Sequence, residues 1–206
     1  MANDIWPVVH AERRALAADL AGLSEDQWRT PSLCGGWSVH DVLAHMVATA
    51  KESPARFVTG LIGAGFSFDR FTQRRIAAER AGGPAATLAA FRAVETSTTA
   101  PPGPTTSWLG EALVHAEDIR RPLGIRHEYP ADAVRQVTEF YASSNVLIGG
   151  KRRVEGVTLQ ATDTDWSHGS GPVVAGPALA LMLATTGRTA VLDELTGPGV
   201  AVLRGR

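Results

Sequence analysis

The chain has 206 residues, of which 44% are hydrophobic and 20% are charged. This composition is typical of a globular protein with one good-sized domain, or with one medium and one small domain. The formal net charge of −1 argues against a nucleic-acid partner and against a basic surface that would bind a membrane. No apolar run approaches the roughly 20 residues that span a bilayer, and the polar residues after Met1 do not resemble a signal peptide. A single cysteine, Cys34, excludes an intramolecular disulfide, so we expect a cytoplasmic protein.

The first two-thirds of the chain show helical spacing of apolar residues. A helix is predicted over residues 4–23, and Ser38 with Asp41 forms a capping pattern that opens a second helix containing His45. Further helices are predicted over residues 54–76 with a break at 63–65, over 85–98, over the run SWLGEALVHAEDIRR that ends at Pro122, and over 131–148.

After residue 150 the pattern changes. Alternating apolar residues predict a strand over 156–163, and short strands are also expected at 173–174 and 199–205. The segment 167–171 is expected to form a turn, 177–188 an apolar helix, and 190–196 a helical segment. We therefore predict a mainly α fold, with a helical bundle over residues 1–150 and a small α/β domain over residues 151–206. The second part would barely fold alone.

Two residues of the run SWLGEALVHAEDIRR form the main candidate site. Glu111 and His115 are four residues apart and therefore share one face of a helix. Both can reach the same small ion, and a third ligand has to come from a neighbouring helix, for which His45 is the candidate. Two imidazoles and one carboxylate leave coordination positions open, as in catalytic metal sites. The pattern predicts a metal-dependent enzyme.

A simpler interpretation of the same spacing stays open. A Glu-x-x-x-His pair on an amphipathic helix is often a solvated surface pair or a helix-stabilising contact. Here, however, apolar residues surround Glu111 and His115 on nearly all sides, and the same holds for His45. Buried polar groups need partners, and one shared cation would satisfy all three.

Three segments resemble a known family in chain order. They are PSLCGGWSVHDVLAHM, GEALVHAEDIRRPLG and TDTDWSHGSGPVVAGPALALMLATTGR. They resemble the mycothiol-dependent maleylpyruvate isomerase family of actinobacteria, which is part of the DinB-like metalloenzyme superfamily. The resemblance implies a DinB-like antiparallel four-helix bundle with a small α/β C-terminal extension. It also implies one divalent metal, usually zinc, held by His45, Glu111 and His115.

The same resemblance implies a chemistry. The metal would activate mycothiol as its thiolate, and the thiolate would act on a small electrophilic substrate. It could add to an activated double bond and be expelled, which isomerises the bond, or be transferred to the substrate. Nickel, manganese or iron in place of zinc stays open, and a homodimer is compatible with such bundles.

Two other functions fit the same residues. A metal-dependent hydrolase would use metal-bound hydroxide and need no thiol. A non-catalytic protein would bind a metal or a small ligand, and if its C-terminal domain held an apolar ligand, that binding would persist in His115→Ala. Neither alternative is excluded by the sequence.

The residues around the three candidate ligands have two interpretations each. Asp41 lies one turn before His45 and is expected to cap its helix, although it could orient the imidazole. Asp118 either orients His115 or pairs with Arg121. His40 is expected on the surface because it lies on another helix face than His45.

Two residues of the C-terminal part are candidate catalytic groups. His168, in a Gly/Ser-rich segment, could act as an acid or base. Arg188 could clamp a carboxylate of the cofactor or substrate, although a helix-capping role also fits it. Cys34 lacks an evident neighbouring base and is expected to be a packed thiol, and Trp37 is expected to pack.

Overall fold

The computed structural model describes residues 4–206. Contacts within the chain divide it into two compact units, Met1–His127 and Glu128–Arg206. Within the described residues, no helix is both long and apolar enough to cross a membrane. The elements of the first unit are α1 (Trp6–Asp19), α2 (Glu25–Arg29), α3 (Val39–Lys51), α4 (Pro54–Gly63), α5 (Phe68–Arg80), α6 (Gly83–Ala93) and α7 (Thr105–Arg120). Those of the second are α8 (Ala131–Ser143), α9 (Gly150–Val154), β1 (Thr158–Ala161), β2 (Ser167–Gly169), β3 (Val173–Gly176), α10 (Ala178–Thr185), the 3₁₀ helix η1 (Thr189–Glu194) and α11 (Val200–Arg204).

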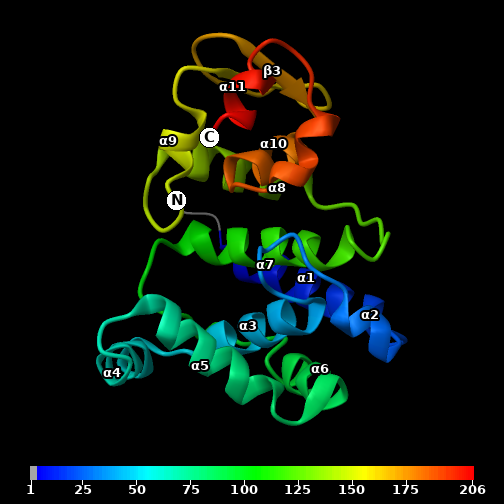
Figure 1. Ribbon diagram of the computed structural model, residues 1–206, viewed down its shortest axis with the longest axis vertical. Coiled ribbons are helices and arrows are strands. Elements are labelled where there is room, and N and C mark those ends of the chain that lie inside the picture. The colour runs from blue at the N-terminus through cyan, green and yellow to red at the C-terminus, as the bar shows by residue number, and fades with distance from the viewer. Residues whose placement is uncertain (1–3) are drawn as a thin grey trace. The chain divides into compact units, whose positions relative to one another are not determined.

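Helix α3 is the centre of the first unit (Figure 1). It packs against α5, α6 and α7, while α1 packs against α6 and α7. Because neighbours surround it, α3 buries apolar side chains on several faces, among them Val42, Leu43, Met46 and Val47. The contact between α3 and α7 brings the helix of His45 beside the helix of Glu111 and His115.

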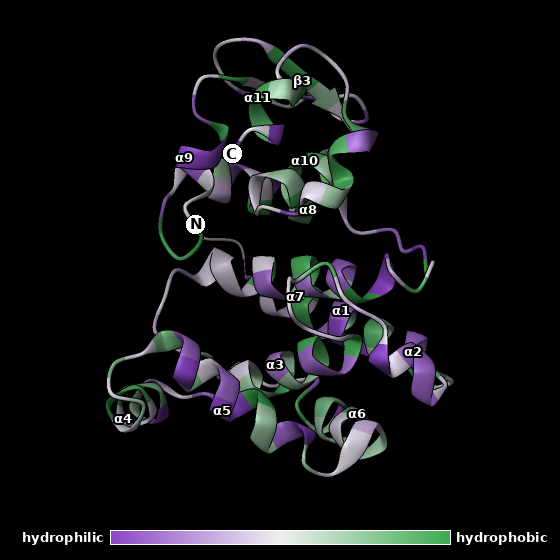
Figure 2. Ribbon diagram, in the orientation of Figure 1, coloured by the Kyte–Doolittle hydropathy of each residue, from purple (hydrophilic) through white to green (hydrophobic). Residues whose placement is uncertain are grey.

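Helices α4 and α5 form the more exposed edge of this unit. None of the residues of α4 is buried, and α5 buries Phe71, Thr72 and Ile76. Figure 2 shows the contrast in hydropathy between the largely hydrophilic α5 and the hydrophobic α10 of the second unit. Helix α4 is therefore held in place mainly by its contact with α5.

The second unit is built around α10. This helix packs against α8 and η1, and also against β1 and β3, because its sequence ALALMLAT is apolar on nearly every face. The strands form one sheet in the order β2-β1-β3, with β1 antiparallel to β2 and parallel to β3. The central strand β1 buries Leu159 completely.

Helix α8 belongs to the second unit by its contacts, whereas the change in sequence pattern comes only after residue 150. The apolar face of α8, which includes Val134, Val137 and Tyr141, packs against α10. The division between the units accordingly falls at His127, where the chain enters the segment that precedes α8.

The predicted fold class, mainly α with a small α/β C-terminal part, is confirmed. Two local predictions are wrong. The segment predicted as a strand over 199–205 contains helix α11 (Val200–Arg204) instead, because the buried positions Val200 and Leu203 are three residues apart, as on a helix face. The segment 167–171 contains the short strand β2, whose residues pair with β1.

Candidate functional site

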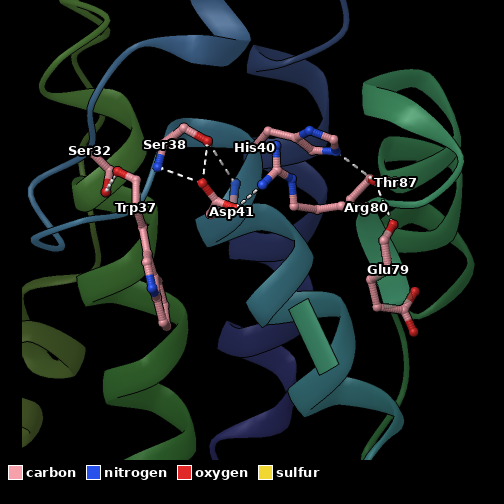
Figure 3. A network of polar contacts seen from close by, with 8 residues as sticks. All are labelled: Ser32, Trp37, Ser38, His40, Asp41, Glu79, Arg80 and Thr87. Carbon is pink, nitrogen blue, oxygen red and sulfur yellow. Dashed lines mark hydrogen bonds and ion pairs between the residues drawn. The ribbon is translucent and has the colours of Figure 1, made fainter. Parts of the chain in front are cut away.

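The start of α3 is fixed by a reciprocal cap (Figure 3). The backbone N–H of Asp41 donates to Ser38 Oγ at 3.2 Å, and the backbone N–H of Ser38 donates to Asp41 Oδ2 at 2.8 Å. Arg80 of α5 donates to Asp41 Oδ1 at 2.6 Å. The predicted capping role of Asp41 is confirmed, and these contacts tie the first turn of α3 to α5.

His40 anchors the same turn to α6. Its side chain is buried, with 6% of its surface exposed, so the prediction that it lies on the surface is wrong. Thr87 Oγ1 donates to the carbonyl oxygen of Glu79 at 2.8 Å, so it accepts from His40 Nε2, which is also 2.8 Å away. Burial, together with the nearby Arg80, lowers the pKa of His40 and keeps it neutral.

The loop before α3 brings Trp37 over the candidate ligands. Ser32 Oγ donates to the carbonyl oxygen of Trp37 at 2.8 Å, and the N–H of Leu33 donates to the carbonyl oxygen of Asp118 at 3.1 Å. The Trp37 ring centroid is 5.0 Å from that of His45 and 6.5 Å from that of His115. The sequence predicts only a packing role for Trp37. Its position directly before Ser38, the cap residue of α3, is the feature that could have indicated its contact with the two histidines.

The two candidate histidines lie against each other. The ring centroids of His45 and His115 are 4.9 Å apart and the rings are nearly perpendicular. Burial, and secondarily the neighbouring His115, lowers the pKa of His45 to about 3, although Asp118 opposes the shift. His45 is therefore a neutral imidazole at physiological pH, which is the protonation state that a metal ligand requires.

Asp118 holds the ring of His115. His115 Nδ1 lies 2.8 Å from Asp118 Oδ2, and the carboxyl group is fully buried. Because an ionised carboxylate only accepts hydrogen bonds, Nδ1 is the donor, and in a neutral ring the lone pair is then on Nε2. A carboxylate behind an imidazole is the usual partner of a metal-ligating histidine, so the orienting role foreseen for Asp118 is the one its geometry supports.

Glu111 contributes a buried oxygen without a partner. Its Oε1 atom is inaccessible to solvent and makes no hydrogen bond. Burial raises the pKa of Glu111, while His115 and Arg13 oppose the shift. Arg13 of α1 is itself buried and donates to the carbonyl oxygens of Val94 and Ser97 at 3.2 and 2.8 Å.

Arg13 was not expected from the sequence near this site. Its spacing from Val9 and Leu16 places it on the buried face of α1, and a charged residue at such a position was the signal that could have found it. Its cationic head partly offsets the effect of burial on the Glu111 carboxyl group.

The donor chemistry of these residues fits a divalent cation. An orphaned carboxylate oxygen, a neutral imidazole and a second imidazole oriented through Nδ1 are the groups that zinc and similar ions bind. Within residues 4–206, however, no group of three or more His, Cys, Asp or Glu side chains is arranged closely enough to hold an ion without adjustment. The assignment of His45, Glu111 and His115 as ligands thus stays a prediction.

The candidate catalytic residues of the C-terminal part both lie in the second unit. His168 of β2 has its Nδ1 3.5 Å from Glu139 Oε1, and its ring stacks on Trp166 at a centroid distance of 6.1 Å. Arg188 is the residue before η1 and donates to the carbonyl oxygen of Thr186 at 2.9 Å. Their catalytic roles, and cofactor binding by Arg188, stay predictions.

Comparison with known proteins agrees with the resemblance seen in the sequence. Residues 9–104 match the family model of the mycothiol maleylpyruvate isomerase N-terminal domain. This match includes His45 and ends before Glu111 and His115. No curated protein matches the chain.

Solved structures extend the agreement to the whole fold. The chain is similar to a crystal structure of a mycothiol-dependent maleylpyruvate isomerase, with 15% sequence identity and a TM-score of 0.64, covering 94% of this chain and 91% of that chain. It is also similar to a variant of such an enzyme in which one histidine is replaced by alanine, with 14% identity, a TM-score of 0.66 and the same coverage of both chains. The fold is therefore that of a mycothiol-dependent maleylpyruvate isomerase. The resemblance to this family is confirmed, with the N-terminal domain as the part that the family model matches.

Proposed function

We propose that this protein is a metal-dependent enzyme that uses mycothiol as a thiol cosubstrate to isomerise, or transfer the thiol to, a small electrophile. The observation that supports the proposal is the contact between the rings of His45 and His115, with the partnerless Oε1 of Glu111 four residues before His115 on the same helix. It lies in a chain whose N-terminal part matches the mycothiol maleylpyruvate isomerase domain.

His45, Glu111 and His115 would hold the ion, most simply zinc. When bound, a divalent ion supplies Lewis acidity and lowers the pKa of a coordinated thiol. Two neutral imidazoles and the Glu111 carboxylate would contribute one negative charge, so a site holding a divalent ion would keep a net charge near +1. That positive charge would favour the thiolate form of the cosubstrate over its neutral thiol.

Residues beside the ligands set the geometry of the site. Asp118 fixes the His115 ring so that Nε2 presents its lone pair. The half-buried Trp37 covers one side of both imidazoles and reduces the access of water to this side, which protects a reactive thiolate from competing proton transfer.

The proposal is tested by measuring turnover of maleylpyruvate, with nickel- or zinc-loaded protein, in the presence and absence of mycothiol. We expect isomerisation that depends on mycothiol and is lost in Glu111→Gln and His115→Asn. Glu25→Gln, an exposed glutamate on α2, is the control for the charge change.

Each outcome decides between the candidate functions. Hydrolysis of a substrate in the absence of any thiol would favour the metal-dependent hydrolase and contradict the proposal. Normal folding of the loaded protein with no turnover of maleylpyruvate or related electrophiles under mycothiol would favour a binding protein.

A further inference from the structure

An open hollow lies between α4 and α5, at the edge of the first unit. Its volume is about 430 Å³, and its lining includes Arg56, Arg74, Arg75 and Phe71 but no acidic side chain. It shares no lining residue with the group formed by His45, Glu111 and His115. The hollow therefore presents a concentration of positive charge that the proposed function leaves unexplained.

Backbone carbonyls hold the three guanidinium groups in place. Arg74 Nη1 donates to the carbonyl oxygen of Gly63 at 2.7 Å, and Arg56 Nη1 donates to that of Lys51 at 3.3 Å. Arg75 Nη2 donates to the carbonyl oxygen of Arg56 at 3.3 Å. A guanidinium group has several N–H donors, so each arginine is oriented while keeping donors for a ligand.

Most of this charge is not neutralised by the protein. Arg75 Nη2 pairs with the buried Glu52 at 2.9 Å. Among the described residues, Arg56 and Arg74 form no ion pair with a carboxylate, although Arg56 shares the electrostatic influence of Glu52 with Arg75, so one negative charge faces three guanidinium groups. Glu79 of α5 is paired with Lys51 at 2.7 Å, and Asp69 of α5 is exposed and does not line the hollow.

The wall of the hollow is preformed and partly aromatic. The Phe71 ring is 5.4 Å from that of Phe57, edge to face, and the Arg75 guanidinium carbon lies 5.3 Å from the Phe71 centroid. A Cβ atom added at Gly60 would lie 2.6 Å from Phe71 Cε2 and 3.1 Å from Arg75 Nη2. Glycine at this position lets α4 approach α5 closely enough to bring the guanidinium groups together.

We propose that this hollow binds a doubly charged oxyanion, through the guanidinium groups of Arg56 and Arg74 with Arg75 beside them. Two arginines without carboxylate partners match two negative charges, and guanidinium forks pair bidentately with carboxylate and phosphate oxygens. Phosphate esters and small dicarboxylates share this chemistry. The site is separate from the metal site, so its occupancy does not depend on the proposed function.

The test is calorimetric titration of the full chain with inorganic phosphate and, separately, with succinate, at low ionic strength. We expect at least one of these probes to bind, and its Kd to rise by about tenfold in both Arg56→Gln and Arg74→Gln, as for the loss of one charge-assisted hydrogen bond. Both side chains are exposed, so the fold should persist, which circular dichroism verifies. Binding of inorganic phosphate would indicate a phosphate ligand, and binding of succinate a dicarboxylate.

The control is Arg29→Gln, which removes the same charge from an exposed arginine of α2 that pairs with Glu25 and Asp26. We expect the Kd of this variant to stay close to that of the wild type. The proposal is overturned if neither probe binds at about 10 mM, or if Arg29→Gln weakens binding as much as the variants of the hollow do. Gly60→Ala should weaken binding as well, because its Cβ displaces Phe71 and Arg75.

Discussion

His115 Nδ1 donates a hydrogen bond of 2.8 Å to Asp118 Oδ2, and the two residues lie one turn apart on α7. The carboxyl group is fully buried and the imidazole is half-buried, so the pair is fixed by the fold and is little exposed to solvent. This contact occupies Nδ1 of His115 and leaves Nε2 as the nitrogen that could bind another group.

The first prediction concerns Asp118. Asp118→Asn keeps the shape of the side chain but removes the charge that holds the proton on His115 Nδ1, so we expect metal affinity to fall by about 10- to 100-fold. Competition with a chromophoric chelator measures the change. Asp69→Asn, an exposed residue of α5, should leave the affinity unchanged, and an unchanged affinity in Asp118→Asn would refute the orienting role.

A second prediction uses Trp37 as a reporter. Its ring lies 5.0 Å from that of His45, so binding of an ion by the imidazole alters the surroundings of the indole. We expect metal titration to change the tryptophan fluorescence of the wild type and to leave that of Trp37→Phe nearly constant. Trp6→Phe should retain the signal, and the idea fails if Trp37→Phe responds as the wild type does.

The third prediction is a pH dependence of the stability of the metal-free protein. Burial lowers the pKa of His45 to about 3 in the folded state, against about 6.5 when unfolded. Between these values the unfolded chain binds a proton that the folded chain does not. The contribution of His45 to stability is therefore complete above pH 6.5 and is lost as the pH falls towards about 3.

Urea denaturation of the wild type and of His45→Gln across this range measures the effect. We expect the variant to lose less stability on acidification between about pH 6.5 and pH 3. If the free energy of unfolding changed with pH in the same way for the two proteins, His45 would be protonated as easily in the folded state as in the unfolded state, which would contradict the prediction.

The fourth prediction concerns the cap of α3. Ser38→Ala removes the acceptor for the Asp41 N–H, so we expect the free energy of unfolding to fall by about 1 kcal/mol. Ser53→Ala is the control, because Ser53 Oγ also accepts from the backbone N–H three residues on, at Arg56, but without a reciprocal side-chain bond, and none of the residues of α4 is buried. We expect a smaller fall in the free energy of unfolding for Ser53→Ala, because α4 can fray without loss of the core. Equal falls for the two variants would contradict the stabilising role assigned to the α3 cap.

The part of the site that the sequence could predict comes from local spacing. The four-residue interval between Glu111 and His115 places both on one face of α7, and the Ser38–Asp41 pattern locates the start of α3 in the structure. Which helix would lie beside α7 is not a local property, so His45 was assigned by its apolar surroundings and by family resemblance.

The rest depends on contacts between distant residues. His40 looked like a surface residue because its hydrogen-bond partner, Thr87, is 47 positions away on another helix. Strand β2 could not be recognised from alternation, since it is a three-residue edge strand that buries none of its side chains. Val200 and Val202 suggested a strand, but the second unit buries Val200 with Leu203 on one face of α11.

The most direct test of the central claim is the metal content of the purified protein, measured by elemental mass spectrometry after incubation with zinc or nickel and removal of unbound ions. We predict about one ion per chain in the wild type, as the open site with His45, Glu111 and His115 implies. The ion should be lost in Glu111→Gln and His115→Asn and retained in Glu25→Gln, with all variants folded. A folded wild-type protein that retains no ion would contradict the account.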